Sequence, residues 1–149
     1  MFNSIRRIQL SLTSRRSCRI AFIAWFVTLF ALSSIPGNAE PEKSIIFADK
    51  IAHAIYFTVG SAAFMMTMAQ SSSYSYSRLK LFIYCIIMAA SVGVYDEWHQ
   101  TFTENRDGNS PGDILANLTG GALGYLVGLR LIHRKIYQHS SSCKEGMSV

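Results

Sequence analysis

Apolar residues gather in four blocks along the chain, separated by polar stretches. The blocks run over Ile20–Ile35, Ala48–Ala69, Leu79–Trp98 and Asp113–Ile132. A helix needs about 20 mostly apolar residues to cross the hydrocarbon core of a bilayer. Each block approaches that length, and the first can be extended back to Ser17. The pattern therefore predicts an all-α polytopic membrane protein whose four transmembrane helices form a compact bundle.

The composition agrees with this interpretation. Hydrophobic residues make up 50% of the chain and charged residues 15%, whereas soluble domains typically carry about 25% charged residues. The three cysteines, Cys18, Cys85 and Cys143, have neither the even number of a disulfide framework nor the spacing of a zinc site. We therefore expect no metal and no cofactor.

Basic residues predict the orientation in the membrane. If all four blocks span, only Lys43, Lys50 and Arg106 lie on one side. The other side has eleven, namely Arg6, Arg7, Arg15, Arg16, Arg19, Arg78, Lys80, Arg130, Arg134, Lys135 and Lys144. Because cytoplasmic loops are rich in Lys and Arg, we expect a multi-pass protein of the inner (plasma) membrane with both termini in the cytoplasm. The same placement accounts for the net charge of +5 without a nucleic-acid partner.

The chain then divides into a basic cytoplasmic arm (1–19), a four-helix membrane domain (20–132) and a polar cytoplasmic tail (133–149). The tail is expected to be disordered from Tyr137 onward. One alternative for the N-terminus stays open. Basic residues, an apolar core and Gly37-Asn38-Ala39 also resemble a signal peptide with its cleavage site. Cleavage there would leave three helices in the same orientation.

Polar residues within the last three blocks follow helical spacing. Positions three, four or seven apart share one face of a helix, and an ionisable residue in a membrane span is costly enough to suggest a function. The last block also places Gly120, Gly124 and Gly128 on one face, which predicts close approach to a neighbouring helix. The polar residues are Asp49, His53 and Tyr56 in the second block, Asp96, Glu97 and Gln100 in the third, and Asp113 and Asn117 in the fourth.

Topology brings these polar residues to one end of the bundle. The second and fourth helices begin, and the third ends, at the extracytoplasmic side. The polar side chains should therefore face one another near that interface. Individual residues also have structural interpretations. Asp113 fits a helix start with Ser110 as N-cap and Pro111 as the first residue, and Asp49 suits the positive start of a helix.

Asp96 and Glu97 stand together at the end of the third helix, where the helix dipole disfavours negative charge. That placement costs stability unless a partner such as Arg106 or a ligand offsets it. Arg106 follows a few residues later, and a guanidinium suits carboxylate pairing better than an ammonium does. We therefore expect Arg106 to pair with the acidic end of this helix. Lys50 points about 100° away from the Asp49 face and is interpreted as an interfacial anchor.

In order and spacing, these residues resemble the VanZ-like family of bacterial membrane proteins. The resemblance covers about Ile20 to Ile132 and implies a four-helix membrane domain that keeps its first helix. It also implies a link to the cell envelope and to antibiotic resistance, since the family's namesake is linked to resistance to the glycopeptide teicoplanin, but it implies no settled activity. The matching segments are Ser33-Ser34-Ile35-Pro36, Asp49-Lys50-x-x-His53-x-x-Tyr56, Asp96-Glu97-x-x-Gln100 and Arg106-x-x-x-Ser110-x-x-Asp113-x-x-x-Asn117-x-x-Gly120.

Three functions stay open, and the first is our expectation. In it, an envelope protein of non-enzymatic or undefined activity binds a ligand in an extracytoplasmic polar pocket. By resemblance, cell-wall precursors and lipid headgroups are the candidate ligands. The site would comprise Asp49, His53, Tyr56, Asp96, Glu97, Gln100, Arg106, Asp113 and Asn117.

The second function is an intramembrane enzyme acting on a lipid-linked or phosphate-bearing envelope substrate. Asp96 or Glu97 would be the general base, His53 its acid–base partner and Arg106 an anion clamp. The starts of the second and fourth helices would also favour a phosphate. The third function is a metal site, although no recognised motif is present. Its ligands would be Asp49, His53, Asp96, Glu97 and His99.

Overall fold

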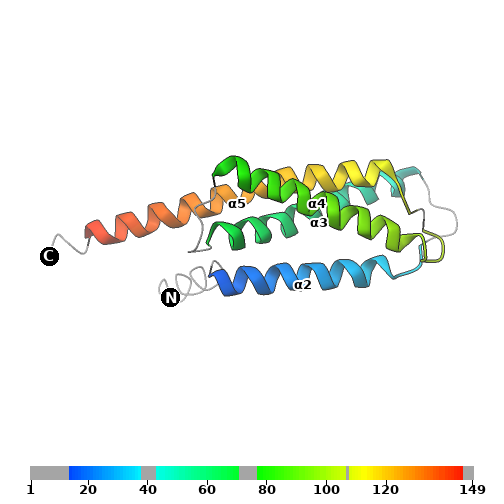
Figure 1. The fold of residues 1–149 in the computed structure, drawn as a ribbon, viewed down its shortest axis with the longest axis horizontal. Coiled ribbons are helices and arrows are strands. Elements are labelled where there is room, and N and C mark those ends of the chain that lie inside the picture. Colours follow the sequence, from blue (N-terminus) through cyan, green and yellow to red (C-terminus); the bar gives the residue numbers. More distant parts are fainter. Residues whose placement is uncertain (1–13, 38–42, 71–76, 107, 146–149) are drawn as a thin grey trace.

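The computed structural model describes residues 14–37, 43–70, 77–106 and 108–145, with side chains described outside 43–47 and 134–145. The helices alternate in direction along one bundle, and α5 projects beyond its neighbours (Figure 1). The described residues contain no strand. All four helices contain segments long and apolar enough to cross a membrane, which confirms the predicted all-α fold. The helices are α2 (Arg15–Ser33), α3 (Lys43–Ala69), α4 (Arg78–Gln100) and α5 (Pro111–Glu145).

Short polar side chains start two of the helices. The hydroxyl of Ser14 accepts a hydrogen bond from the backbone N–H of Ser17 at 3.1 Å, and Ser77 does the same for Lys80 at 3.3 Å. Such N-caps satisfy backbone donors that a helix start otherwise leaves unpaired. The predicted start of α5 is confirmed, because Pro111 is its first residue.

Two helix boundaries differ from the sequence-based prediction. Helix α3 begins at Lys43, so Asp49 lies inside the helix and does not mark its start. Helix α5 continues to Glu145, and the expectation of a disordered tail from Tyr137 is wrong as far as that residue. No Gly or Pro interrupts the polar sequence after the last span, so helical hydrogen bonding continues past the apolar block. The candidate cleavage site at Asn38-Ala39 lies outside the described residues.

Helices α3 and α5 share the largest contact in the bundle, and glycines of α5 make it possible. A Cβ atom at Gly120 would overlap the carbonyl oxygen of Ala54, and one at Gly124 would overlap that of Thr58. Small residues let two backbones approach in this way within membranes. The predicted close approach of the last helix is confirmed, and its neighbour is α3.

Helix α2 is fixed to α3 by two reciprocal hydrogen bonds. The indole Nε1 of Trp25 donates to the carbonyl oxygen of Tyr56 at 2.9 Å, and the Tyr56 hydroxyl donates to the carbonyl oxygen of Trp25 at 2.9 Å. Gly60 lies directly against the indole ring, where any side chain would overlap it. These contacts set the height of α2 relative to α3, so the first helix is an integral part of the bundle.

The interior has two apolar layers and a polar layer. The first apolar layer contains the buried residues Cys18, Met65, Met66, Leu81, Cys85 and Tyr125. The second contains Trp25, Leu29, Phe57, Met88 and Ala89. Apart from Ser61, the buried polar residues lie at the end where α2 and α4 finish and α5 begins. They are Ser33, Asp96, Glu97, Gln100, Asp113 and Asn117.

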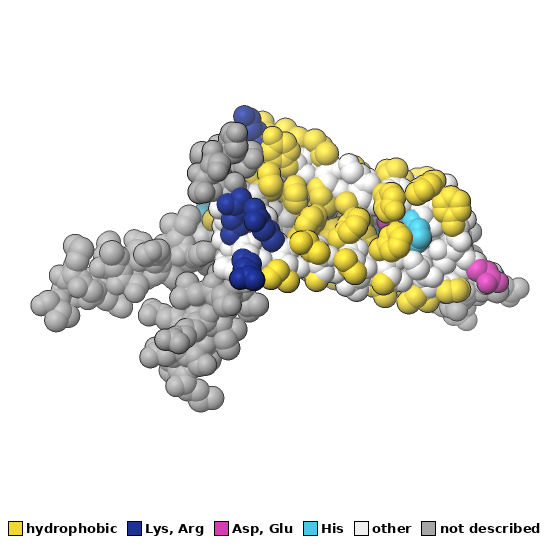
Figure 2. All heavy atoms as spheres, turned by 60° about the horizontal axis from the view of Figure 1, so that its bottom comes forward, with side chains coloured by type: hydrophobic (Ala, Val, Ile, Leu, Met, Phe, Trp, Pro, Cys, Tyr) yellow, Lys and Arg dark blue, Asp and Glu magenta, His cyan; other side chains and the backbone are white. Residues whose placement is uncertain are grey.

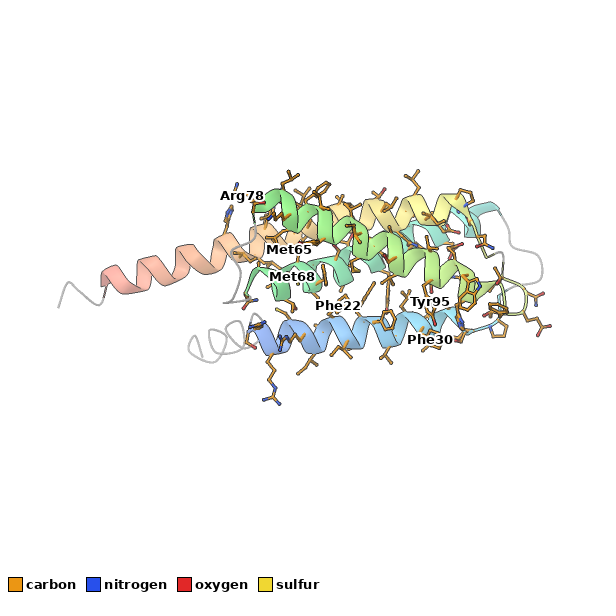
Figure 3. All side chains as sticks on the ribbon, in the orientation of Figure 1. Phe22, Phe30, Met65, Met68, Arg78 and Tyr95 are labelled. Atoms are coloured by element: carbon orange, nitrogen blue, oxygen red, sulfur yellow. The ribbon has the colours of Figure 1, made fainter. Side chains whose placement is uncertain are left out.

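The outer surface is that of a protein in a lipid bilayer. Large hydrophobic side chains are exposed along all four helices, and they cover the middle of the visible face, whereas Lys and Arg side chains gather at one end (Figure 2). Near the polar layer, Phe30 of α2 and Tyr95 of α4 stack with ring centroids 6.4 Å apart (Figure 3). Trp98, with 52% of its surface exposed, continues this aromatic group. Interfacial aromatic belts have this composition.

Candidate functional site

A cavity of about 160 Å³ lies at the polar end of the bundle. An apolar cavity of about 150 Å³ can hold a benzene-sized molecule, so the space admits part of a small headgroup. Its apolar lining comes from Leu29, Leu32, Ala52 and Phe57, and its polar lining from Ser33, Asp49, His53, Tyr56, Asp96, Gln100 and Arg106. The lining thus combines residues of α2, α3 and α4 with one residue of the loop before α5.

The structure divides the nine predicted site residues into two groups. Six line the cavity: Asp49, His53, Tyr56, Asp96, Gln100 and Arg106. Glu97, Asp113 and Asn117 lie outside the lining, in a buried layer where α3, α4 and α5 meet. The two groups touch through His53, since it lines the cavity and also contacts Asn117.

Asp96 is the most enclosed carboxylate of the cavity wall, with 3% of its surface exposed. The hydroxyl of Ser33 donates a hydrogen bond to its Oδ1. The amide Nε2 of Gln100 donates to its Oδ2 at 2.9 Å. Both carboxylate oxygens are therefore partnered, and α2 is tied to the end of α4.

His53 links the cavity to the layer behind it. Its Nδ1 lies 3.0 Å from Oδ1 of Asn117, an acceptor that favours the N–H on Nδ1. Its Nε2 lies 3.9 Å from Oδ1 of Asp49, whose side chain is 47% exposed. One turn further along α3, the hydroxyl of Tyr56 donates its hydrogen bond to the Trp25 carbonyl oxygen. Tyr56 therefore shapes the wall of the cavity and fixes α2.

The buried layer contains one direct ion pair. Nζ of Lys50 lies 2.7 Å from Oδ1 of Asp113, and the side chains are 35% and 9% exposed. Glu97 accepts the backbone N–H of Ser110 on Oε2 at 2.7 Å. A protein carboxylate thus accepts the backbone N–H just before α5, and the suggested role of this helix start in binding a phosphate stays a prediction. Lys50 is a structural ion-pair partner in addition to any interfacial role.

The predicted pairing of Arg106 with the acidic end of α4 is wrong. Its Nε donates to the carbonyl oxygen of Ile35 at 3.1 Å, and its Nη2 donates to that of Leu32 at 3.2 Å. Arg106 therefore binds carbonyl oxygens at the end of α2 and just beyond it, and that of Leu32 also accepts the backbone N–H of Ile35 at 3.2 Å. Among the described residues, the ion pairs are Lys50–Asp113 and the longer His53–Asp49 contact.

Two arrangements of possible metal ligands occur among the described residues. His53, Asp96 and Glu97 form one, and Asp49, His53 and Asp113 form the other; within each, the candidate donor atoms lie within 4.8 Å of one another. The five metal ligands considered from the sequence do not come together as one group. His99 points elsewhere, because its Nε2 lies 3.0 Å from the Ser34 hydroxyl and its ring stacks on Phe30.

The predicted site residues left out Ser33, although its segment belonged to the resemblance, and the ionic role of Lys50 was also missed. Ser33 follows Trp25 and Leu29 at steps of four, and all three are buried. The spacing of these three residues could therefore have predicted which face of α2 packs against the bundle and that it ends at the site. Lys50 gave no such signal, since a long flexible stem carries its ammonium away from the direction of its Cα–Cβ bond.

Searches against known protein families, curated proteins and solved structures find no match for this chain. Its assignment as a multi-pass membrane protein rests on the four apolar helices themselves.

Proposed function

We propose that this chain is a VanZ-like protein of the inner membrane that binds a ligand in the cavity at its extracytoplasmic end. The candidate ligands are cell-wall precursors and lipid headgroups, and the expected role lies in the cell envelope and its response to glycopeptide antibiotics. One observation carries the proposal. Six residues that the sequence singled out, from two helices and a loop, line one cavity of about 160 Å³. The family and the role come from the sequence resemblance alone.

The distribution of charge supports the orientation. Within the described part of the chain, most basic side chains lie at the end opposite the cavity, at the starts of α2 and α4 and late in α5 (Figure 2). Two basic side chains are described at the cavity end, and both have partners: Lys50 pairs with Asp113, and Arg106 donates to the carbonyl oxygens of Leu32 and Ile35. By the positive-inside rule, this distribution favours an extracytoplasmic cavity.

The lining suits an amphiphilic ligand. Leu29, Leu32 and Phe57 supply apolar surface, while Asp49 and His53 supply polar contacts. Ligand sites commonly combine a mostly apolar wall with a few placed polar groups. Ala52 lines the cavity, and its neighbour Ile51 is exposed on the apolar outside of α3, so a molecule with a polar head and an apolar tail suits this setting.

A strain lacking the protein tests the role. We expect increased sensitivity to teicoplanin or an envelope-stress response, restored by the wild-type chain. Ala52→Trp should fill the cavity and fail to restore resistance, whereas Ile51→Trp, on the lipid-facing side of the same helix, should restore it. Equal rescue by both variants, at equal protein levels, would contradict a role for the cavity. Turnover of a lipid-phosphate substrate by the purified protein would indicate an enzyme instead.

Reporter fusions test the orientation. A fusion after Val149 should report a cytoplasmic location, and one near Glu104 should report an extracytoplasmic location. An extracytoplasmic C-terminus would place the cavity on the wrong side for an envelope ligand.

A further inference from the structure

One of the two donor arrangements is almost entirely buried. His53, Asp96 and Glu97 each place a candidate ligand atom within 4.8 Å of the other two. Asp96 and Glu97 are 3% and 1% exposed, and the His53 side chain is 10% exposed. His53 and Asp96 also line the cavity. The arrangement therefore has two members at the wall of the cavity, with Glu97 buried behind them.

The hydrogen bonding around Glu97 is incomplete. Its Oε2 accepts the Ser110 N–H, but its Oε1 has no hydrogen-bond partner among the described residues. Most buried polar atoms have a partner, and an exception calls for an explanation such as a bound ion. In the same layer Asp113 has its own cation in Lys50. Neither Asp96 nor Glu97 forms an ion pair with a described Lys or Arg.

We propose that His53, Asp96 and Glu97 bind a divalent transition-metal ion of the Zn²⁺ type. Buried carboxylates are normally paired or coordinate metals, and a divalent ion would compensate both charges and partner the open Glu97 oxygen. The inference deepens the proposed function and rests on it, because the ion would present its remaining coordination position to the ligand in the same cavity.

The ligand set favours a transition metal over Mg²⁺ or Ca²⁺. Imidazole suits Zn²⁺ and related ions, whereas Mg²⁺ and Ca²⁺ prefer oxygen donors alone. Zinc sites that keep one position open likewise use three protein ligands, and imidazole and carboxylate groups are among them. The contact of His53 with Asn117 resembles the hydrogen bonds that orient metal-ligating histidines from behind.

Metal binding to the full-length protein in lipid nanodiscs tests this inference. The protein is stripped with a chelator and dialysed against Zn²⁺ or Mg²⁺, and the bound metal is measured by mass spectrometry. We expect stoichiometric Zn²⁺ and no comparable Mg²⁺. His53→Gln and Glu97→Gln should weaken Zn²⁺ binding by about tenfold or more. The matched variants His99→Gln and Glu104→Gln, which lie outside the donor set, should bind as the wild type does.

Several results would overturn the inference. One is a wild-type protein that binds no stoichiometric Zn²⁺. Another is an equal loss of Zn²⁺ binding in the test and control variants. A third is an Asp113→Asn variant that loses Zn²⁺ while Glu97→Gln keeps it. Should the Glu97 variant fail to fold, Co²⁺ substituted into the wild type gives a second measurement. Its visible absorption must show mixed nitrogen and oxygen ligation, and an aqua-ion spectrum would reject the site. If Zn²⁺ does not bind but Ala52→Trp still abolishes resistance, the metal site is rejected while the proposal of a ligand-binding cavity is kept.

Discussion

Removal of the Ser33 hydroxyl should destabilise the bundle, because this group is one of two donors to a buried carboxylate. In Ser33→Ala, Oδ1 of Asp96 loses the donor that joins α2 to α4, while Gln100 still donates to Oδ2. A hydrogen bond to a charged group contributes about 1.5–3 kcal/mol, and a neutral one about 0.5–1.5 kcal/mol. Only 3% of the Asp96 surface is exposed, so water cannot replace the lost hydrogen bond. We therefore expect the free energy of unfolding to fall by about 1.5–3 kcal/mol.

Unfolding in mixed detergent micelles measures the effect. The chain has two tryptophans, and the fluorescence of Trp25 reports separation of α2 from α3, because its indole is buried between them. Ser34→Ala is the matched control, since the Ser34 side chain is exposed and bonds to its own helix and to His99. A surface change of this kind should cost less than about 0.5 kcal/mol. Equal stabilities of the two variants would refute the role assigned to the Ser33–Asp96 bond.

Three further predictions follow from the packing. Lys50→Met should lower the free energy of unfolding by about 1–3 kcal/mol, which is less than the roughly 3–5 kcal/mol lost when a fully buried pair is broken, because Lys50 is partly exposed. Adding Asp113→Asn should recover most of that loss, and no recovery in unfolding measurements would contradict the pair. Gly124→Ala should cost about 1–3 kcal/mol against the rigid Thr58 backbone, whereas Gly128→Ala, which meets flexible Met65, should be nearly neutral in the same assay. Mass spectrometry of the mature protein should find α2 still attached, and a mature N-terminus at Glu40 would show cleavage.

The sequence predicted the helices and the meeting of polar stripes because both depend on periodicity. Spacing places Asp49 and His53 on one face of α3, and alternating helix direction brings that face to the end of α4. These are geometric consequences of four spans, so they hold without knowledge of any side-chain conformation. The glycine face of α5 was readable for the same reason, since close packing requires small residues at regular intervals.

The partners of long side chains could not be predicted in this way. Arg106 follows Asn105, whose φ of 55° turns the chain in the left-handed region; the loop thereby places the guanidinium over the end of α2 and away from α4. Helical spacing says nothing about such loops. Lys50 likewise reaches Asp113 through its flexible stem. The charges were visible in the sequence, but their pairing depends on conformations that the periodic pattern does not encode.

The exposed aromatic group has a consequence for how a ligand would reach the cavity. Trp98 and Asp96 are two residues apart in α4, which separates them by about 3 Å along the helix axis. Tryptophan belts mark the level of lipid headgroups, so the cavity lies at that level. A ligand anchored in the adjacent leaflet by its own tail would search for it in two dimensions, at a high effective concentration. For the proposed ligand, tethering would then add selectivity: a modest affinity would suffice for an anchored headgroup, while the same headgroup free in water would bind poorly.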